Sequence, residues 1–68
     1  MFHANELRAE LVRRELSVED VARQMGIDKA SLYRKLKGDS EFLRIEIEKL
    51  VNILQLSGED VLRIFFTN

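Results

Sequence analysis

The sequence predicts an all-α fold built from five short helices. Apolar residues recur at the i, i+3, i+4, i+7 spacing of an amphipathic helix within residues 18–25 and 47–54. No segment shows the alternating pattern of a convincing strand. Helix-start residues such as Ser17 and helix-ending glycines such as Gly26 separate the periodic segments. We therefore expect one compact helical domain covering residues 1–68.

Composition excludes several classes of protein. A chain of 68 residues is a single small domain, and a chain of this size buries only about 60% of the surface that it exposes when unfolded. It contains no cysteine and one histidine, His3, so we expect no disulfide, metal site or cofactor. No run approaches the roughly 18 apolar residues of a membrane span, and the N-terminus lacks a signal peptide. We expect a cytoplasmic protein that does not bind membranes.

Charge is segregated along the chain although the net charge is only −1. Residues 27–38 hold four basic side chains and one acidic one, a local +3, whereas residues 39–48 hold four acidic and one basic, a local −3. A polyanionic partner responds to this local field more than to the sum. We expect the acidic segment 39–48 to be solvated surface, with a protein-docking role as the alternative.

The first helix is expected from about Asn5 to Glu15, with Asn5 as the N-cap and Leu7 and Leu11 as an inward-facing pair. His3 is expected to be a frayed terminal residue. Basic and acidic side chains alternate along this helix and are expected to pair on its surface: Arg8, Arg13 and Arg14 with Glu6, Glu10 and Glu15.

The second helix starts at Ser17, and Asp20 three residues later gives an arrangement close to a capping box. Gly26 ends this helix, because the residue just past a helix often takes a left-handed conformation that glycine adopts without steric cost. Ala22 lies four residues before Gly26, where a small side chain allows two helices to approach closely. We therefore expect a tight corner at Gly26.

The third helix is expected from Lys29 to about Lys37, closed by Gly38, with Leu32 and Leu36 turned inward. Asp28 precedes it and is expected to be the N-cap, with its carboxylate occupied by backbone N–H groups. The alternative role for this carboxylate is to accept a hydrogen bond from a cytosine amine.

The C-terminal helices are expected within about residues 44–66. The fourth carries an apolar stripe of Ile47, Leu50, Val51 and Leu54, and the fifth begins at Ser57 with Asp60 at the capping-box position. Adjacent helical residues point about 100 degrees apart. Phe65 and Phe66 therefore cannot both face the core, and one of them is free for a dimer contact.

Two short helices joined by a glycine turn, about residues 17–37, form a helix-turn-helix, whose second helix reads base edges in the major groove. Ala22, Gly26, Leu32 and Leu36 are its structural positions. With both leucines turned inward, the outer face of the second helix carries five residues: Lys29, Ala30, Tyr33, Arg34 and Lys37.

The segment LSVEDVARQMGIDKASLYRKLKG resembles the helix-turn-helix of the Cro and repressor family of phage and bacterial regulators. The segment EFLRIEIEKLVNILQLSGEDVLRIFF is similar to the C-terminal part of small Cro-like phage proteins. This resemblance implies a five-helix lambda-repressor-like fold, a recognition helix spanning 28–37, and a phosphate contact from Arg44 in the loop after it. Val18 departs from the family, since many relatives carry a phosphate-binding glutamine there.

Side-chain chemistry suggests roles on the outer face. Lys29 and Arg34 are the best donors to guanine O6 and N7, Tyr33 can pack on a thymine methyl or bond a phosphate, and Ala30 allows close approach. Near the end of the helix, Lys35 and Lys37 suit phosphates. A further phosphate site is expected at Ser17 and the N–H groups that start the second helix.

We therefore predict a sequence-specific regulator that binds double-stranded DNA, a Cro-like phage or prophage repressor acting by operator occupancy. It would be a homodimer held through its C-terminal helix, with no small-molecule ligand. The alternative is a protein-interaction module derived from a helix-turn-helix, such as an antitoxin-like or anti-repressor protein. An enzyme is not expected, because no nucleophile and base pair, metal cluster or phosphate loop can be assembled from these residues.

Overall fold

The computed structural model describes residues 1–68, and it contains helices and no strand. It confirms the all-α fold of five helices. A π-helical segment, η1, continues the last helix without a break. The elements are α1 (Ala4–Arg13), α2 (Val18–Met25), α3 (Lys29–Lys37), α4 (Arg44–Leu54), α5 (Gly58–Val61) and η1 (Leu62–Phe66).

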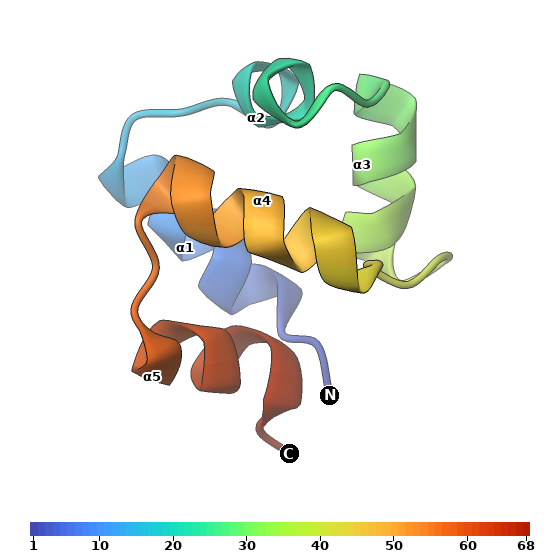
Figure 1. Cartoon of the computed structure of the whole chain (residues 1–68). Coiled ribbons are helices and arrows are strands. Elements are labelled where there is room, and N and C mark those ends of the chain that lie inside the picture. The colour runs from blue at the N-terminus through green and yellow to red at the C-terminus, as the bar shows by residue number, and fades with distance from the viewer.

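Helix α4 crosses the middle of the molecule, with α2 on one side of it and α5 on the other, and α3 stands at one end (Figure 1). Helix α2 packs against both α3 and α4, and α1 packs against η1. The molecule measures 27 × 25 × 20 Å along its principal axes. None of its helices has the length and apolar character that crossing a membrane requires.

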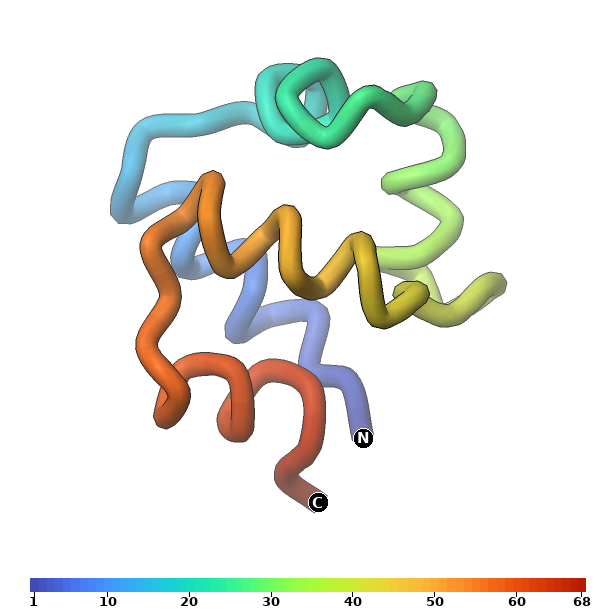
Figure 2. Tube along the Cα trace, viewed as in Figure 1, coloured from blue at the N-terminus to red at the C-terminus, as the bar shows by residue number.

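The N- and C-terminal segments lie side by side (Figure 2) because His3 joins them. Its backbone N–H donates to the Ile64 carbonyl at 2.7 Å, and its ring Nε2 bonds the Thr67 carbonyl. The prediction that His3 is frayed is therefore wrong. It also occupies the N-cap position of α1, since its carbonyl accepts from the N–H groups of Glu6 and Leu7. Helix α1 consequently starts one residue earlier than predicted, and Asn5 lies within it.

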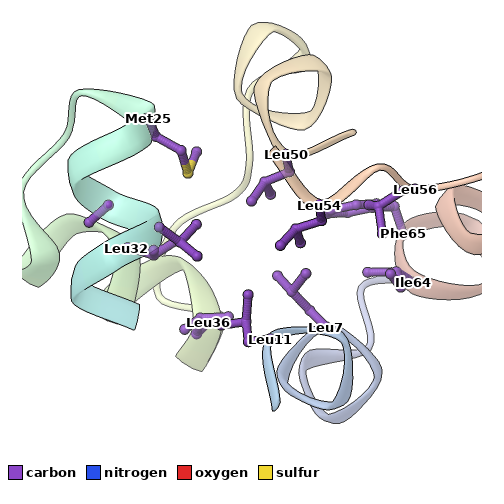
Figure 3. Close-up of a cluster of buried hydrophobic side chains, with 12 residues drawn as sticks. Leu7, Leu11, Met25, Leu32, Leu36, Leu50, Leu54, Leu56, Ile64 and Phe65 are labelled. Carbon is purple, nitrogen blue, oxygen red and sulfur yellow. The ribbon is translucent and has the colours of Figure 1, made fainter. Parts of the chain in front are cut away.

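One cluster of apolar side chains forms the core, and its members point toward one another from all the long helices and the C-terminal segment (Figure 3). The inward positions predicted in α1 and α3 are confirmed. The core residues are Leu7, Leu11, Val21, Ala22, Met25, Leu32, Leu36, Leu50, Leu54, Leu56, Ile64 and Phe65.

Capping boxes start α2 and α5, as the sequence predicts. The hydroxyls of Ser17 and Ser57 accept from the backbone N–H groups of Asp20 and Asp60, each at 3.0 Å. The two carboxylates accept from the serine N–H groups in return, at 3.0 and 2.9 Å. These backbone hydrogen bonds from the serines, assisted by Arg23 and Arg63 respectively, lower the pKa of Asp20 and of Asp60 to about 2.

Glu10 is a buried ion-pair centre rather than a surface partner. Its side chain is only 2% exposed, and it pairs with Arg13 and Arg14 of α1 and with Arg63 of η1. Burial raises the pKa of Glu10, but hydrogen bonds from Arg14, Arg63 and Arg13 outweigh this effect and hold the pKa below its usual value. Pairing along α1 is thus confirmed for Arg13 and Arg14, but the prediction that it lies on the surface is wrong for Glu10, because this partner is buried.

Arg63 ties the C-terminal segment to α1. It pairs with Glu6 and Glu10 of α1 and, at 2.8 Å, with Asp60 of α5. The hydrogen bonds to these carboxylates, that of Asp60 first, raise its pKa. Three carboxylates from two helices therefore converge on one guanidinium, which fixes η1 against α1.

Phe65 and Phe66 point to different environments, as predicted. Phe65 is 7% exposed and packs in an aromatic group with Phe2 and Phe42, at ring-centroid distances of 5.6 Å to each. Phe66 is 61% exposed. Phe65 is therefore excluded as a dimer candidate, because the core already covers its ring, and a dimer contact through Phe66 stays a prediction.

We predict that Gly26→Ala lowers the free energy of unfolding by about 1 to 2 kcal/mol, the cost of a left-handed conformation for a residue with a Cβ. Gly26 has a φ of +78°, and an added Cβ would meet no atom within 4 Å, so backbone strain is the whole effect. Gly58→Ala is the matched control, because Gly58 has equal space and no positive φ. Urea titration should show it unchanged or stabilised by up to about 1 kcal/mol; equal losses would contradict the argument.

We predict that Glu10→Gln costs about 1 to 3 kcal/mol of unfolding free energy at pH 7, because hydrogen bonds from charged donors to a buried carboxylate are weakened. The folded pKa of Glu10 is lowered, so this contribution is fully present above the unfolded value of about 4.3 and is lost as pH falls through the folded pKa. Urea titrations at several pH values should therefore show the difference from wild type shrinking below about pH 4.

The control is Glu15→Gln, since Glu15 is exposed and takes part in none of the ion pairs. It should leave the urea midpoint unchanged across the same pH range. A loss in Glu10→Gln that stays constant down to pH 2 would show that packing, not charge, is responsible.

Candidate nucleic-acid interface

The corner between α2 and α3 is built as the sequence predicts. Gly26 takes the left-handed conformation, and the N–H of Ile27 reaches back to the Ala22 carbonyl at 3.0 Å, which closes the end of α2. Ala22 is 2% exposed, so its small side chain lies where the helices pack. Gly38 closes α3 in the same conformation.

The orientation of α3 is set by the burial of two of its side chains. Leu32 and Leu36 are 1% and 3% exposed and belong to the core. Their burial turns the opposite side of α3 to solvent. Five residues are exposed on that side, all of them predicted: Lys29, Ala30, Tyr33, Arg34 and Lys37.

The charged groups of this outer face are weakly engaged within the chain. Arg34 donates to the Ser31 hydroxyl at 3.2 Å, and Lys37 pairs with Asp39 at 3.7 Å with both side chains largely exposed. Lys29 takes part in none of the ion pairs or side-chain hydrogen bonds. Because exposed pairs contribute little energy, these cations remain available to another partner.

Lys35 is not part of the outer face. Its Nζ lies 3.1 Å from Glu46 Oε1 and donates to the Glu41 carbonyl, and its side chain is 12% exposed. The residue lies three positions after Leu32, on the side of α3 that faces the protein. The prediction that Lys35 contacts phosphate is therefore wrong for this arrangement, because its ammonium already has an internal partner.

Glu46 joins this internal pair to the start of α4. One of its carboxylate oxygens accepts from the Leu43 N–H at 2.8 Å, and the residue is 9% exposed. The expectation of a solvated acidic segment 39–48 is wrong at this residue. The sequence does contain the relevant signal, because Glu46 precedes the buried Leu50 and Leu54 at intervals of four, on the same side of the helix.

Arg44 is the first residue of α4 and not a loop residue. Its side chain is 93% exposed and pairs with Glu48 one turn later at 3.1 Å. An exposed pair of this kind is worth only about 0.3 to 0.5 kcal/mol. The guanidinium of Arg44 is thus free to exchange its partner. It belongs to α4, the helix that follows α3 after the loop of residues 38–43 (Figure 1).

The start of α2 is already occupied by negative charge. The Asp20 carboxylate accepts from the Ser17 N–H, and Glu19 adds a second acidic side chain in the first turn. The Ser17 oxygen accepts from the Asp20 N–H. Of the predicted donors, the N–H groups of Ser17 and Asp20 are thus engaged within the capping box, and the hydroxyl hydrogen of Ser17 is left for a phosphate.

Asp28 does not use its side chain as a helix cap. Its backbone has the extended cap conformation, with φ −67° and ψ 143°, and its carbonyl accepts from the Leu32 N–H. The side chain makes no cap hydrogen bond, and the residue is exposed. The prediction that backbone N–H groups occupy this carboxylate is therefore wrong.

Lys49 makes a hydrogen bond that the sequence does not predict. Its Nζ, on α4, donates to the Met25 carbonyl at the end of α2, at 3.0 Å. A cation suits a helix C-terminus, where unpaired carbonyls carry partial negative charge. The two residues lie 24 positions apart, so no local pattern indicates the pairing. Lys49 and the Lys35 to Glu46 pair together hold the helix-turn-helix against α4.

A comparison with known protein families agrees with this geometry. No group of three metal-ligating side chains comes together anywhere in the chain. Neither a curated protein nor a solved structure matches the chain. Residues 6–66 match the family described as the Cro/C1-type HTH DNA-binding domain. They include all of α2, α3, α4, α5 and η1, and all of α1 except its first two residues. The chain therefore belongs to the Cro/C1-type HTH DNA-binding domain family.

Proposed function

We propose that this protein is a transcriptional regulator that recognises a specific double-stranded DNA sequence with α3. The observation that carries this proposal is the outer face of α3, where Lys29, Arg34 and Lys37 are exposed while Leu32 and Leu36 anchor the helix. Concentrated cationic donors on a rigid helix suit both the phosphates and the base edges of the major groove.

Within the groove, each exposed side chain of α3 has a role that follows from its chemistry. Lys29 and Arg34 donate to guanine O6 and N7, and Arg34 is able to do so in a bidentate manner. Tyr33, 38% exposed, packs on a thymine methyl or bonds a phosphate. Ala30 lets the helix approach the bases closely.

Phosphate contacts flank this face. Lys37 exchanges its long, exposed contact with Asp39 for a phosphate, and Arg44 does the same with its Glu48 pair. Ser17 contributes its hydroxyl hydrogen at the start of α2. Each cation that neutralises a phosphate releases a counterion, so affinity falls steeply with salt.

The mechanism proposed is occupancy of an operator that overlaps a promoter, as in a Cro-like phage or prophage repressor. Such a protein acts on DNA in the cytoplasm of a bacterial or phage-infected cell. Its control would come from its own concentration or from a competing repressor.

We propose that the protein acts as a homodimer through its C-terminal helix, because one module offers few base contacts and dimers bind half-sites about 34 Å apart. Phe66 and Leu62 are the apolar side chains available for this contact, at 61% and 59% exposed. Phe66 also borders a surface cleft of about 420 Å³ whose walls include Met1 and Phe42.

The alternative, a protein-interaction module that binds through its acidic segment, has weaker support. Glu46 of that segment is buried against Lys35. Asp39 pairs with Lys37, and Glu48 pairs with Arg44. Of the four carboxylates, the exposed ones are Asp39, Glu41 and Glu48, and two of these lie beside cations, so the segment offers a protein partner less negative charge than its composition suggests.

The function is tested by selection from a random duplex library at physiological salt, where a two-fold symmetric site should be enriched. On that site, Arg34→Ala should cost about 1 to 3 kcal/mol and relax preference at one position, because a guanine contact is lost. Lys37→Ala should weaken all sequences alike and lower the salt slope by about one. Titrations at several salt concentrations separate the two effects.

The charge-matched control is Arg8→Ala, since Arg8 is exposed on α1 and belongs to no ion pair. It should leave affinity and preference unchanged. If the folded wild-type protein enriches no site, the function proposed here is wrong and a protein partner becomes the better explanation.

For the dimer, we predict that Phe66→Ala shifts the monomer–dimer equilibrium toward monomer and weakens binding to the two-fold site more than to a single half-site. Val12→Ala is the control, because Val12 is an exposed apolar residue of α1 at 76%. Sedimentation equilibrium measures the association directly. A wild-type monomer at high concentration, with unchanged DNA binding by Phe66→Ala, would refute the interface.

A further inference from the structure

We propose that Asp28 is a specificity-determining residue that accepts a hydrogen bond from the exocyclic amine of cytosine at the start of α3. The inference rests on the proposed function and adds to it the identity of a base. Three properties of the residue carry it: a carboxylate without an internal partner, a place at the leading end of α3, and a chemistry that is opposite to that of the other base-reading side chains.

The carboxylate of Asp28 is uncommitted. The caps of α2 and α5 use their side chains, since Ser17 and Ser57 each accept from a backbone N–H. Asp28 stands at the equivalent position of α3 and makes no such bond, and it takes part in none of the ion pairs of α3. It is also exposed. A carboxylate acceptor therefore stands at this helix start with no internal role.

Its position places it among the residues that reach base edges. A recognition helix contacts bases with its N-terminal residues, and Asp28 directly precedes Lys29, the first residue of α3. Lys29 and Asp28 therefore enter the groove next to each other. Their chemistry is complementary to a G·C pair, with the ammonium donating to guanine and the carboxylate accepting from cytosine.

The major groove allows a carboxylate to single out one base. Cytosine presents only an amine donor there, whereas guanine presents two acceptors, thymine presents a carbonyl, and adenine places an acceptor beside its amine. A carboxylate has no proton to give at neutral pH and is repelled by acceptors. Phosphates repel it too, so Asp28 lowers affinity for DNA in general and raises it where cytosine is present. This difference is specificity obtained by rejection.

The test is selection from random duplexes with wild type, Asp28→Asn and Asp28→Ala, each checked for folding. In wild type, one column of each half-site should be cytosine. Asp28→Asn should change that column to adenine, which an amide pairs bidentately. Asp28→Ala should make the column indifferent, so that the preference of wild type for its own site over a site substituted in that column, on the order of tenfold, is lost.

The matched control is Glu19→Gln, which removes an exposed negative charge from the start of α2. It should raise affinity for all sequences slightly and leave every column unchanged. The same pattern in Asp28→Asn, higher affinity with no changed column, would overturn the proposal and reduce Asp28 to a repulsive charge.

Three further results would overturn the proposal, and they identify which part of it fails. If wild type enriches no site, the proposed function fails together with this inference. If wild type enriches a site but the columns of the Asp28 variants are those of wild type, only the inference fails. A drop in urea midpoint for Asp28→Ala as large as that for Ser57→Ala would identify the carboxylate as a helix cap, which also overturns the proposal.

Discussion

A helix of nine residues is marginal in water by itself, so α3 depends on the burial of Leu32 and Leu36 for both its existence and its direction. The two leucines enter the core shared with α1, α2 and α4. Their burial leaves a cationic strip on the opposite side. The left-handed turn at Gly26 matters because it delivers the chain to this position, and the core then holds it there.

Charged residues divide into a group that links parts of the protein internally and a group that is exposed to a partner. Glu10, Arg63, Lys35 and Glu46 lie partly or fully inside and link elements that are distant in sequence. Lys29, Arg34, Lys37 and Arg44 lie outside and are held weakly or not at all. A partner meets only the second group. The internal pairs sum to zero, so a chain with a net charge of −1 presents a cationic face because its exposed charges are segregated along the chain, not because charge is buried.

The unpaired carboxylate of Asp28 gives this face a second sign of charge at its leading end. Donors alone favour any guanine-rich or phosphate-rich surface, and an acceptor beside them makes the face selective. In the complex proposed here, the cations supply affinity and the guanine contacts, and the carboxylate adds discrimination for cytosine.

Local patterns in the sequence determined the number and type of the helices, the corner at Gly26, the capping boxes at Ser17 and Ser57, and the inward leucines, because turn conformation and helical periodicity are set by near neighbours. They also determined the residues exposed on α3, once the leucines were placed. Tertiary structure alone decided which charges are free: it gave Lys35 an internal partner in Glu46, Lys49 a carbonyl of α2, and Arg63 three carboxylates. It also decided that Phe65 is the inward phenylalanine and that His3 is tied to the C-terminal segment. These outcomes depend on contacts between residues far apart in the chain. No local pattern indicates which cation and which carboxylate folding brings within reach of each other.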